Sequence, residues 1–301
     1  MAFTVSNALR ETLLRLGQLN VSKATGGSTT TIVDSTLANE NSSDDDWNDG
    51  WALVIRDAGG AAGAPENEFQ RISDFVASTG TFTVDTAFTV SPASGDVYGY
   101  ASSQFALQTM IRLLNTALVE LGDVPLLDTT TLDTAANQTE YTAAVAWKRR
   151  KPYRIDIQGR TGDANDNQWH AVWDWEWIPA AAGSTGLIVF KGQPLSSRDI
   201  RVWYQDAHPA VNAYSDAINE RFEPDLVVKA FVLAIRGWQV ERDDGSDESL
   251  QQKWNKAKSE YEAAIASRKP ERPKRRPRLM IPGLHEQAEP LDDQPMAPAA
   301  P

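Results

Sequence analysis

The sequence predicts an α+β protein: a helical bundle with antiparallel β insertions, followed by an extended C-terminal arm. Four segments repeat apolar residues at helical spacing, and two blocks of short strand-like runs lie between them. The arm is predicted from its closely spaced prolines, which are incompatible with a helix: Pro270, Pro273, Pro277 and Pro282. The length of 301 residues is typical of about two domains.

Four apolar stripes predict the helical core. They are Leu9, Leu13 and Leu16; Leu107, Ile111, Leu114, Leu118 and Leu121; Val227, Phe231, Ala234, Ile235 and Trp238; and Leu250, Trp254, Tyr261 and Ile265. Their limits are marked by Ser6, a candidate N-cap, by Gly122 after the second stripe and by Pro224 before the third. Helices with such stripes bury them against one another, so we expect a bundle.

Two β-rich blocks interrupt these helices. The candidate strands of the first block are residues 29–34, 51–56, 68–72, 80–84 and 96–100. Glycine and proline separate them, which predicts a small antiparallel barrel or sandwich inserted between the first two helices. The second block, at about residues 153–204, contains the strand-like runs 154–157, 169–177, 186–190 and 199–204.

These patterns divide the chain into a helical core, two β segments and an arm. The predicted boundaries are 1–27 and 102–150 for the first part of the helical core, 28–101 for the inserted barrel or sandwich, 151–205 for the β-rich segment, 206–267 for the second part of the core, and 268–301 for the arm and tail.

Composition excludes several classes of protein. The net charge of −12, from 29 basic and 41 acidic residues, argues against a protein that coats nucleic acid, because phosphate binding needs a basic surface. The absence of cysteine excludes disulfides, cysteine-ligated metals and cysteine nucleophiles. We expect no membrane span, since no apolar stretch approaches the required ~18 residues. The first residues do not resemble a secretion signal, so we expect synthesis in the cytoplasm.

The acidic runs do not match a calcium-binding loop. In the run 44–50, the register places Gly50 one position later than the loop requires. In the run that starts at Asp163, Gln168 stands where the loop needs glycine. We therefore expect solvated turns at both places and no bound metal.

The sequence also lacks the motifs of common enzymes. It contains no nucleophile elbow, no phosphate-binding loop and no dinucleotide fingerprint. Asp174 and Glu176 are the obvious carboxylate pair for glycoside hydrolysis, but alternation along a strand places both on one exposed face. We expect neither enzymatic activity nor a cofactor.

Four tryptophans in the second block share one strand parity: Trp169, Trp173, Trp175 and Trp177. In a continuous strand their rings project from the same face of the sheet. Such a face can cover the core, form an interface between subunits, where aromatic residues are enriched, or stack on sugars. The residues leave these three interpretations open.

Charge is distributed unevenly along the chain. Residues 31–50 contain six acidic residues and no basic one: Asp34, Glu40, Asp44, Asp45, Asp46 and Asp49. Residues 268–278 contain one acidic residue and seven basic ones: Arg268, Lys269, Arg272, Lys274, Arg275, Arg276 and Arg278. This segment therefore carries a net charge of +6, and the rest of the chain carries −18. An apolar run follows at once: Leu279, Met280 and Ile281. We call residues 268–278 the basic strip and residues 279–281 the apolar plug. A stiff basic segment next to an apolar one predicts a docking peptide for a protein partner, with nucleic-acid binding and a solvated tail as alternatives.

One long segment resembles a known family. IRVWYQDAHPAVNAYSDAI at 200–218 and FEPDLVVKA at 222–230 resemble a pattern in the head-to-tail connector proteins of tailed bacteriophages. In that pattern a strand ends in VWY, an HP turn and a polar loop with D-x-I follow, and P-x-x-L or P-x-x-V opens a helix. The β block between Asp46 and Tyr98 is also similar to a module that recurs in phage virion proteins.

The resemblance covers most of residues 1–285 and implies a structural role at the neck of a virion. It implies a homo-oligomeric, expected dodecameric, ring that binds the portal protein on one side and a tail, nozzle or tail-terminator protein on the other. The arm from Arg268 to Ile281 would reach into the portal. Double-stranded DNA would pass through an acidic channel without specific binding, and no membrane would be involved.

Two alternative functions remain open from the residues. The first is a tail, baseplate or fibre component that binds host-surface glycans on the tryptophan face. The second is a carbohydrate-active enzyme.

Overall fold

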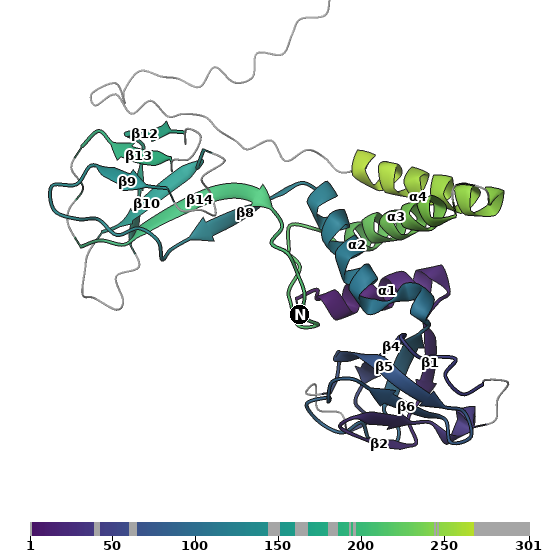
Figure 1. The fold of residues 1–301 in the computed structure, drawn as a ribbon. Coiled ribbons are helices and arrows are strands. Elements are labelled where there is room, and N and C mark those ends of the chain that lie inside the picture. The colour runs from purple at the N-terminus through teal and green to yellow at the C-terminus, as the bar shows by residue number, and fades with distance from the viewer. Residues whose placement is uncertain are drawn as a thin grey trace, which may run out of the picture. The chain divides into compact units, whose positions relative to one another are not determined.

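The computed structural model describes residues 2–267, with gaps at 39–42, 60–64, 144–150, 160–167, 180–185, 193, 195–196, 244 and 246. In this part of the chain, fourteen strands form three antiparallel sheets, accompanied by four α-helices (Figure 1). The predicted fold class is therefore wrong. The chain is mostly β-sheet and is not a helical bundle with β insertions.

The predicted helices are present, so the error lies in how much of the fold they make up. They are α1 (Val5–Leu16), α2 (Leu107–Glu120), α3 (Pro224–Arg242) and α4 (Glu248–Ala266). Of the three hydrophobic cores in the described part of the chain, two are built from buried residues of strands and loops alone. A sheet that packs on itself or on a second sheet supplies its own interior, so these β regions need no helical bundle to bury their apolar side chains.

The first β region is a seven-stranded sheet. Its strands are β1 (Asn20–Lys23), β2 (Gly26–Ser28), β3 (Thr31–Val33), β4 (Trp51–Arg56), β5 (Phe69–Val76), β6 (Thr81–Val84) and β7 (Val97–Ala101), in the order β1-β7-β4-β5-β6-β3-β2. Only Ala24 and Thr25 separate the two edge strands, and their N–H groups donate to the carbonyls of Asp96 and Val33 respectively. Because one short stretch of chain supplies both edges, the sheet curls into a barrel.

The interior of this barrel is aromatic, and Asp34 is a fully buried carboxylate within it. The Tyr98 hydroxyl donates to Asp34 at 3.0 Å, and Ser22 and Thr36 donate as well. Burial by itself would raise the pKa of Asp34, but these hydrogen bonds outweigh it and hold the pKa below the ordinary 3.8. Burial, reinforced by the charge of Asp34, raises the pKa of Tyr98 far above its usual range, so the hydroxyl remains a donor.

A second core joins the barrel to α1, α2 and α3. Trp51 of β4 is fully buried in it, and its Nε1–H donates to the Phe105 carbonyl at 2.8 Å, just before α2 begins. Phe69 of β5 lies edge-to-face between Trp51 and Tyr214, with ring centroids 6.2 and 6.1 Å away. Aromatic residues of β4 and β5 therefore hold the barrel against the helices.

The second β region consists of two smaller sheets that share a core. Its strands are β8 (Asp123–Asp128), β9 (Glu140–Thr142), β10 (Arg154–Gln158), β11 (Trp169–Val172), β12 (Trp175–Ile178), β13 (Leu187–Phe190) and β14 (Ile200–Ala207). One sheet has the order β11-β10-β14-β8 and the other β12-β13-β9. β8 and β9 lie in the range 102–150, where the sequence predicted the first part of the helical core.

Candidate interaction surfaces

The arm that the sequence predicts to dock on a partner lies outside the described residues. This applies to Arg268, Lys269, Arg272, Lys274, Arg275, Arg276, Arg278, Leu279, Met280 and Ile281. The helix α4 ends at Ala266, and the chain divides into a unit Met1–Ile265 and a unit Ala266–Pro301. The arm is therefore the direct continuation of α4 along the chain.

The four tryptophans of the second block do not lie on one continuous strand. β11 ends at Val172 and β12 begins at Trp175, and the two strands belong to different sheets. β11 pairs with β10, whereas β12 pairs with β13. The chain thus passes from one sheet to the other at Trp173 and Asp174, so the four rings do not project from one face of a single strand.

The surroundings of the four rings differ accordingly. Trp175 and Trp177 are half-buried and pack against the core that the two sheets share, which favours the core-packing interpretation for these two. The Arg201 guanidinium lies over the Trp169 ring at 3.5 Å from its centroid. Trp173 is 83% exposed. The structure therefore leaves Trp173 as the indole available to a partner.

The described residues of the carboxylate pair and of the acidic runs form no cluster of metal ligands. Asp174 and Glu176 are both exposed, and Asp174 is 3.5 Å from Lys191. Among the described residues, no three His, Asp or Glu side chains gather as metal ligands would. Asp163, the start of the second acidic run, lies outside the described part.

The segment that carries the family resemblance has a clear structural role. His208 is buried, its Nδ1 lies 2.7 Å from the Pro209 carbonyl, and its Nε2 accepts from the Asn219 N–H at 2.9 Å. Asp216 accepts from two backbone N–H groups of its own loop, which lowers its pKa. These bonds close the loop between β14 and α3.

The same loop is fastened to the start of α1. The Val5 N–H donates to the Asp216 carbonyl, and the Ile218 N–H donates to the Phe3 carbonyl. Ile218 is buried in the core that joins the helices to the barrel. The D-x-I segment therefore connects the N-terminal segment of the chain to the entrance of α3.

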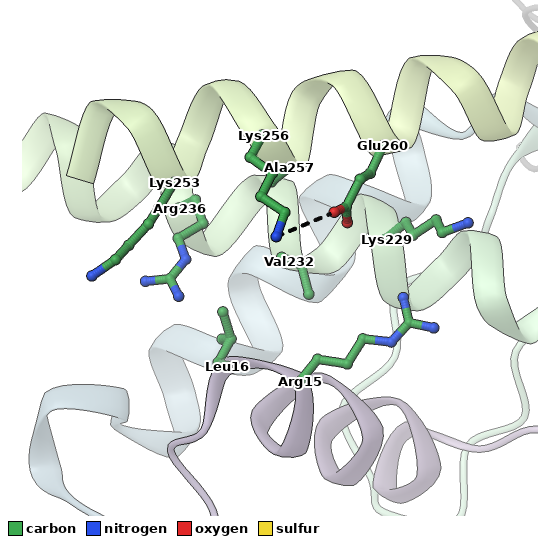
Figure 2. A pocket seen from close by; sticks show the side chains of 9 residues that line it. All are labelled: Arg15, Leu16, Lys229, Val232, Arg236, Lys253, Lys256, Ala257 and Glu260. Carbon is green, nitrogen blue, oxygen red and sulfur yellow. Dashed lines mark ion pairs between the residues drawn. The ribbon is translucent and has the colours of Figure 1, made fainter. Parts of the chain in front are cut away.

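A basic cavity, which the sequence did not predict, lies among α1, α3 and α4 (Figure 2). The cavity measures about 420 Å³ and has five basic residues and one acidic residue in its wall. Its lining residues are Arg15, Leu16, Lys229, Val232, Arg236, Lys253, Lys256, Ala257 and Glu260. On a chain of net charge −12, such a concentration of positive charge is the feature that most needs explanation.

Asp225 and Glu260 neutralise part of this positive charge. Asp225 pairs with Arg15 and, at 2.8 Å, with Lys229, and hydrogen bonds from both lower its pKa. The Lys256 ammonium lies 3.9 Å from Glu260. Three of the five cations thus have an acidic neighbour.

Arg236 and Lys253 have no acidic partner among the residues that the structure describes. The Arg236 guanidinium donates to the Gln239 side chain at 2.8 Å, and partial burial lowers its pKa. Figure 2 shows the Arg236 and Lys253 side chains next to each other. Two adjacent cations repel each other, so this end of the cavity favours an anion.

The helical period contains part of the signal for this cavity. Lys229 and Arg236 are seven residues apart on α3, and Lys253 and Glu260 are seven apart on α4, so each pair shares a helical face. The sequence does not show that these two faces meet, nor that Arg15 of α1 joins them.

Comparison with known proteins adds no family assignment. No protein-family model matches this chain, and no match is found among curated proteins. No helix in the described part of the chain has the length and apolar character needed to cross a membrane.

Proposed function

We propose that this chain is a non-enzymatic virion protein that forms the head-to-tail adaptor ring of a tailed bacteriophage. In this role it docks on the portal protein through its C-terminal arm and surrounds the passage of DNA to the tail. The observation that carries the proposal is the separation of charge. Residues 268–278, which follow α4 almost directly, carry +6, while the rest of the chain carries −18.

This separation suits both tasks of an adaptor. A conduit for DNA works best when its wall repels phosphate, because an anionic wall does not retain the passing duplex. Attachment needs a different surface, and a proline-rich basic strip is stiff and extended, so it loses little conformational entropy when it docks on an acidic groove. The resemblance at 200–230 supports the same role.

The docking arm gives the first test. Deletion of residues 268–301 is expected to abolish co-purification with the portal protein of the same phage, because the basic strip and the apolar plug are both lost. A matched variant replaces the seven basic residues of 268–278 with glutamine and retains Leu279, Met280 and Ile281. It is expected to weaken portal binding and to remove most of its salt dependence.

Two results would contradict the proposal at different levels. Unchanged portal binding after the deletion would show that the arm is not the docking element. Cryo-EM maps that place these subunits at a spike tip, with no ring at the capsid vertex, would reject the adaptor role itself.

A glycan-binding tail component remains the second candidate, because Trp173 is 83% exposed. An exposed indole offers a flat apolar face of the kind that stacks on sugar rings. Glycan-array binding that is lost in Trp173→Ala would favour this function. Two controls apply: Trp177→Ala, a change at a half-buried ring, should retain glycan binding, and Trp173→Ala should still bind the portal protein.

A further inference from the structure

The basic cavity among α1, α3 and α4 has two cations that lack an acidic partner in the described chain, Arg236 and Lys253. Lys256 also lines the cavity, and its ammonium group forms only a long ion pair with Glu260, at 3.9 Å. The three side chains come from two facing helices (Figure 2). An anion that enters here meets positive charge from both helices.

The shape and setting of the cavity argue against a nucleic-acid duplex as its occupant. A duplex is bound by an extended basic surface that contacts many phosphates. Here the positive charge is confined to about 420 Å³ and is bordered by Asp225 and Glu260. A chain of net charge −12 also repels a long polyanion. A short acidic peptide segment fits these conditions better.

The chain itself contains such a segment in the turn Ser43–Asp49, which we call the acidic turn. Asp44, Asp45 and Asp46 are consecutive and exposed, and none of them has a basic partner among the residues that the structure describes. Asp49 belongs to the turn but pairs with Arg71.

Hydrogen bonds fix the shape of the acidic turn. Asp44 accepts from the Ala77 N–H at 2.8 Å, Asp46 accepts from the Ser43 N–H at 2.7 Å, and Asp45 accepts from the Asn48 amide at 2.6 Å. Each of these bonds uses one carboxylate oxygen and leaves the other for a partner. The turn is thus held in one shape before binding, which lowers the entropic cost of docking.

We propose that the basic cavity of one copy receives the acidic turn of a second copy. A ring needs a heterologous contact, in which one surface of each subunit meets a different surface of its neighbour. The cavity and the acidic turn are two such surfaces of opposite charge on one chain. The inference rests on the proposed ring and names the contact that would close it.

The test compares self-association of the full chain with that of the Lys253→Glu/Lys256→Glu variant. Both lysines are exposed, so the fold should tolerate the change, and thermal unfolding checks this. Mass photometry of the chain alone and of its portal complex is expected to show self-association weakened about tenfold or more. Lys258→Glu is the matched control for the single variant Lys253→Glu, because each makes the same charge change on α4 and Lys258 lies outside the cavity wall.

A reciprocal variant makes the test specific to the two surfaces. Asp46→Lys is expected to weaken self-association, and Asp46→Lys combined with Lys253→Glu is expected to restore much of it, since the charges of both surfaces are exchanged. Replacement of Asp44, Asp45 and Asp46 by asparagine retains an acceptor oxygen at each position, so it removes the charge without removing the turn.

Each remaining outcome overturns the inference. Unchanged self-association of the cavity variant, or a full chain that forms no oligomer even on the portal, would reject it. Loss of labelled-duplex or inorganic-phosphate binding in that variant, with self-association intact, would assign the cavity to phosphate instead. The adaptor role is tested separately, since deletion of residues 268–301 addresses portal binding and leaves both surfaces in place.

Discussion

At the residue scale, Asp34 is a carboxylate that the barrel buries and satisfies. It accepts hydrogen bonds from Ser22, Thr36 and Tyr98. An amide in place of the carboxylate cannot accept all of these bonds and brings donors with no partner. We expect Asp34→Asn to lower the free energy of unfolding by about 1–3 kcal/mol at pH 7, measured by urea denaturation.

The pH dependence of this effect has a defined sign. Because the pKa of Asp34 is lower in the folded state than its ordinary 3.8, the ionised carboxylate stabilises the fold above pH 3.8. That contribution is lost as the pH falls from 3.8 through the folded-state pKa. The stability difference between Asp34→Asn and the wild type should therefore shrink below pH 3.8. A difference that stays constant down to pH 2 would contradict this account, and Asp74→Asn is the control on β5.

At the scale of elements, α4 is attached to the rest of the protein by one narrow stripe. Ala257 is its only buried residue in the described chain, and Tyr261 packs beside it against the core of the helices. A helix held along one stripe opens more easily than one enclosed on several sides.

We therefore expect Tyr261→Ala to loosen α4 without loosening the barrel. Loss of the half-buried ring removes about 1 kcal/mol of apolar burial. Hydrogen exchange should become faster across Glu248–Ala266 while Phe69–Val76 in the barrel stays protected. Glu262→Ala, an exposed change on the same helix, should leave both segments unchanged. Equal acceleration in the barrel would show that α4 is part of one cooperative unit with it.

At the scale of the whole molecule, the distribution of charge predicts how the protein treats DNA. Residues 1–267 should not bind a labelled duplex at physiological salt, because their net charge is strongly negative. Any binding by the full chain should come from the arm and fall steeply with added salt. Fluorescence anisotropy from 50 to 300 mM NaCl, roughly bracketing physiological salt, tests both statements. Tight duplex binding by the truncated chain would contradict the proposed passive conduit.

Local patterns in the sequence were sufficient for the helices. The stripe from Leu107 to Leu121 predicted α2, and Pro224 marked the start of α3. The predicted fold class was wrong because the share of helix and sheet in the whole fold depends on which segments pack or pair with one another. The strand β8, for example, contains Pro125 and is a strand because it pairs with β14, about 75 residues later in the chain.

The candidate surfaces divide in the same way. The basic arm and the acidic turn each consist of residues that are consecutive in the chain, so the sequence by itself determined them. It also determined the overall acidic charge and the positions of the four helices. Only the tertiary structure decided that the tryptophan run breaks between two sheets and that Arg15, Arg236 and Lys253 line one cavity. Local periodicity shows which residues share a face of one element. Which faces meet depends on contacts between residues far apart in the chain, and these form only when the whole unit folds.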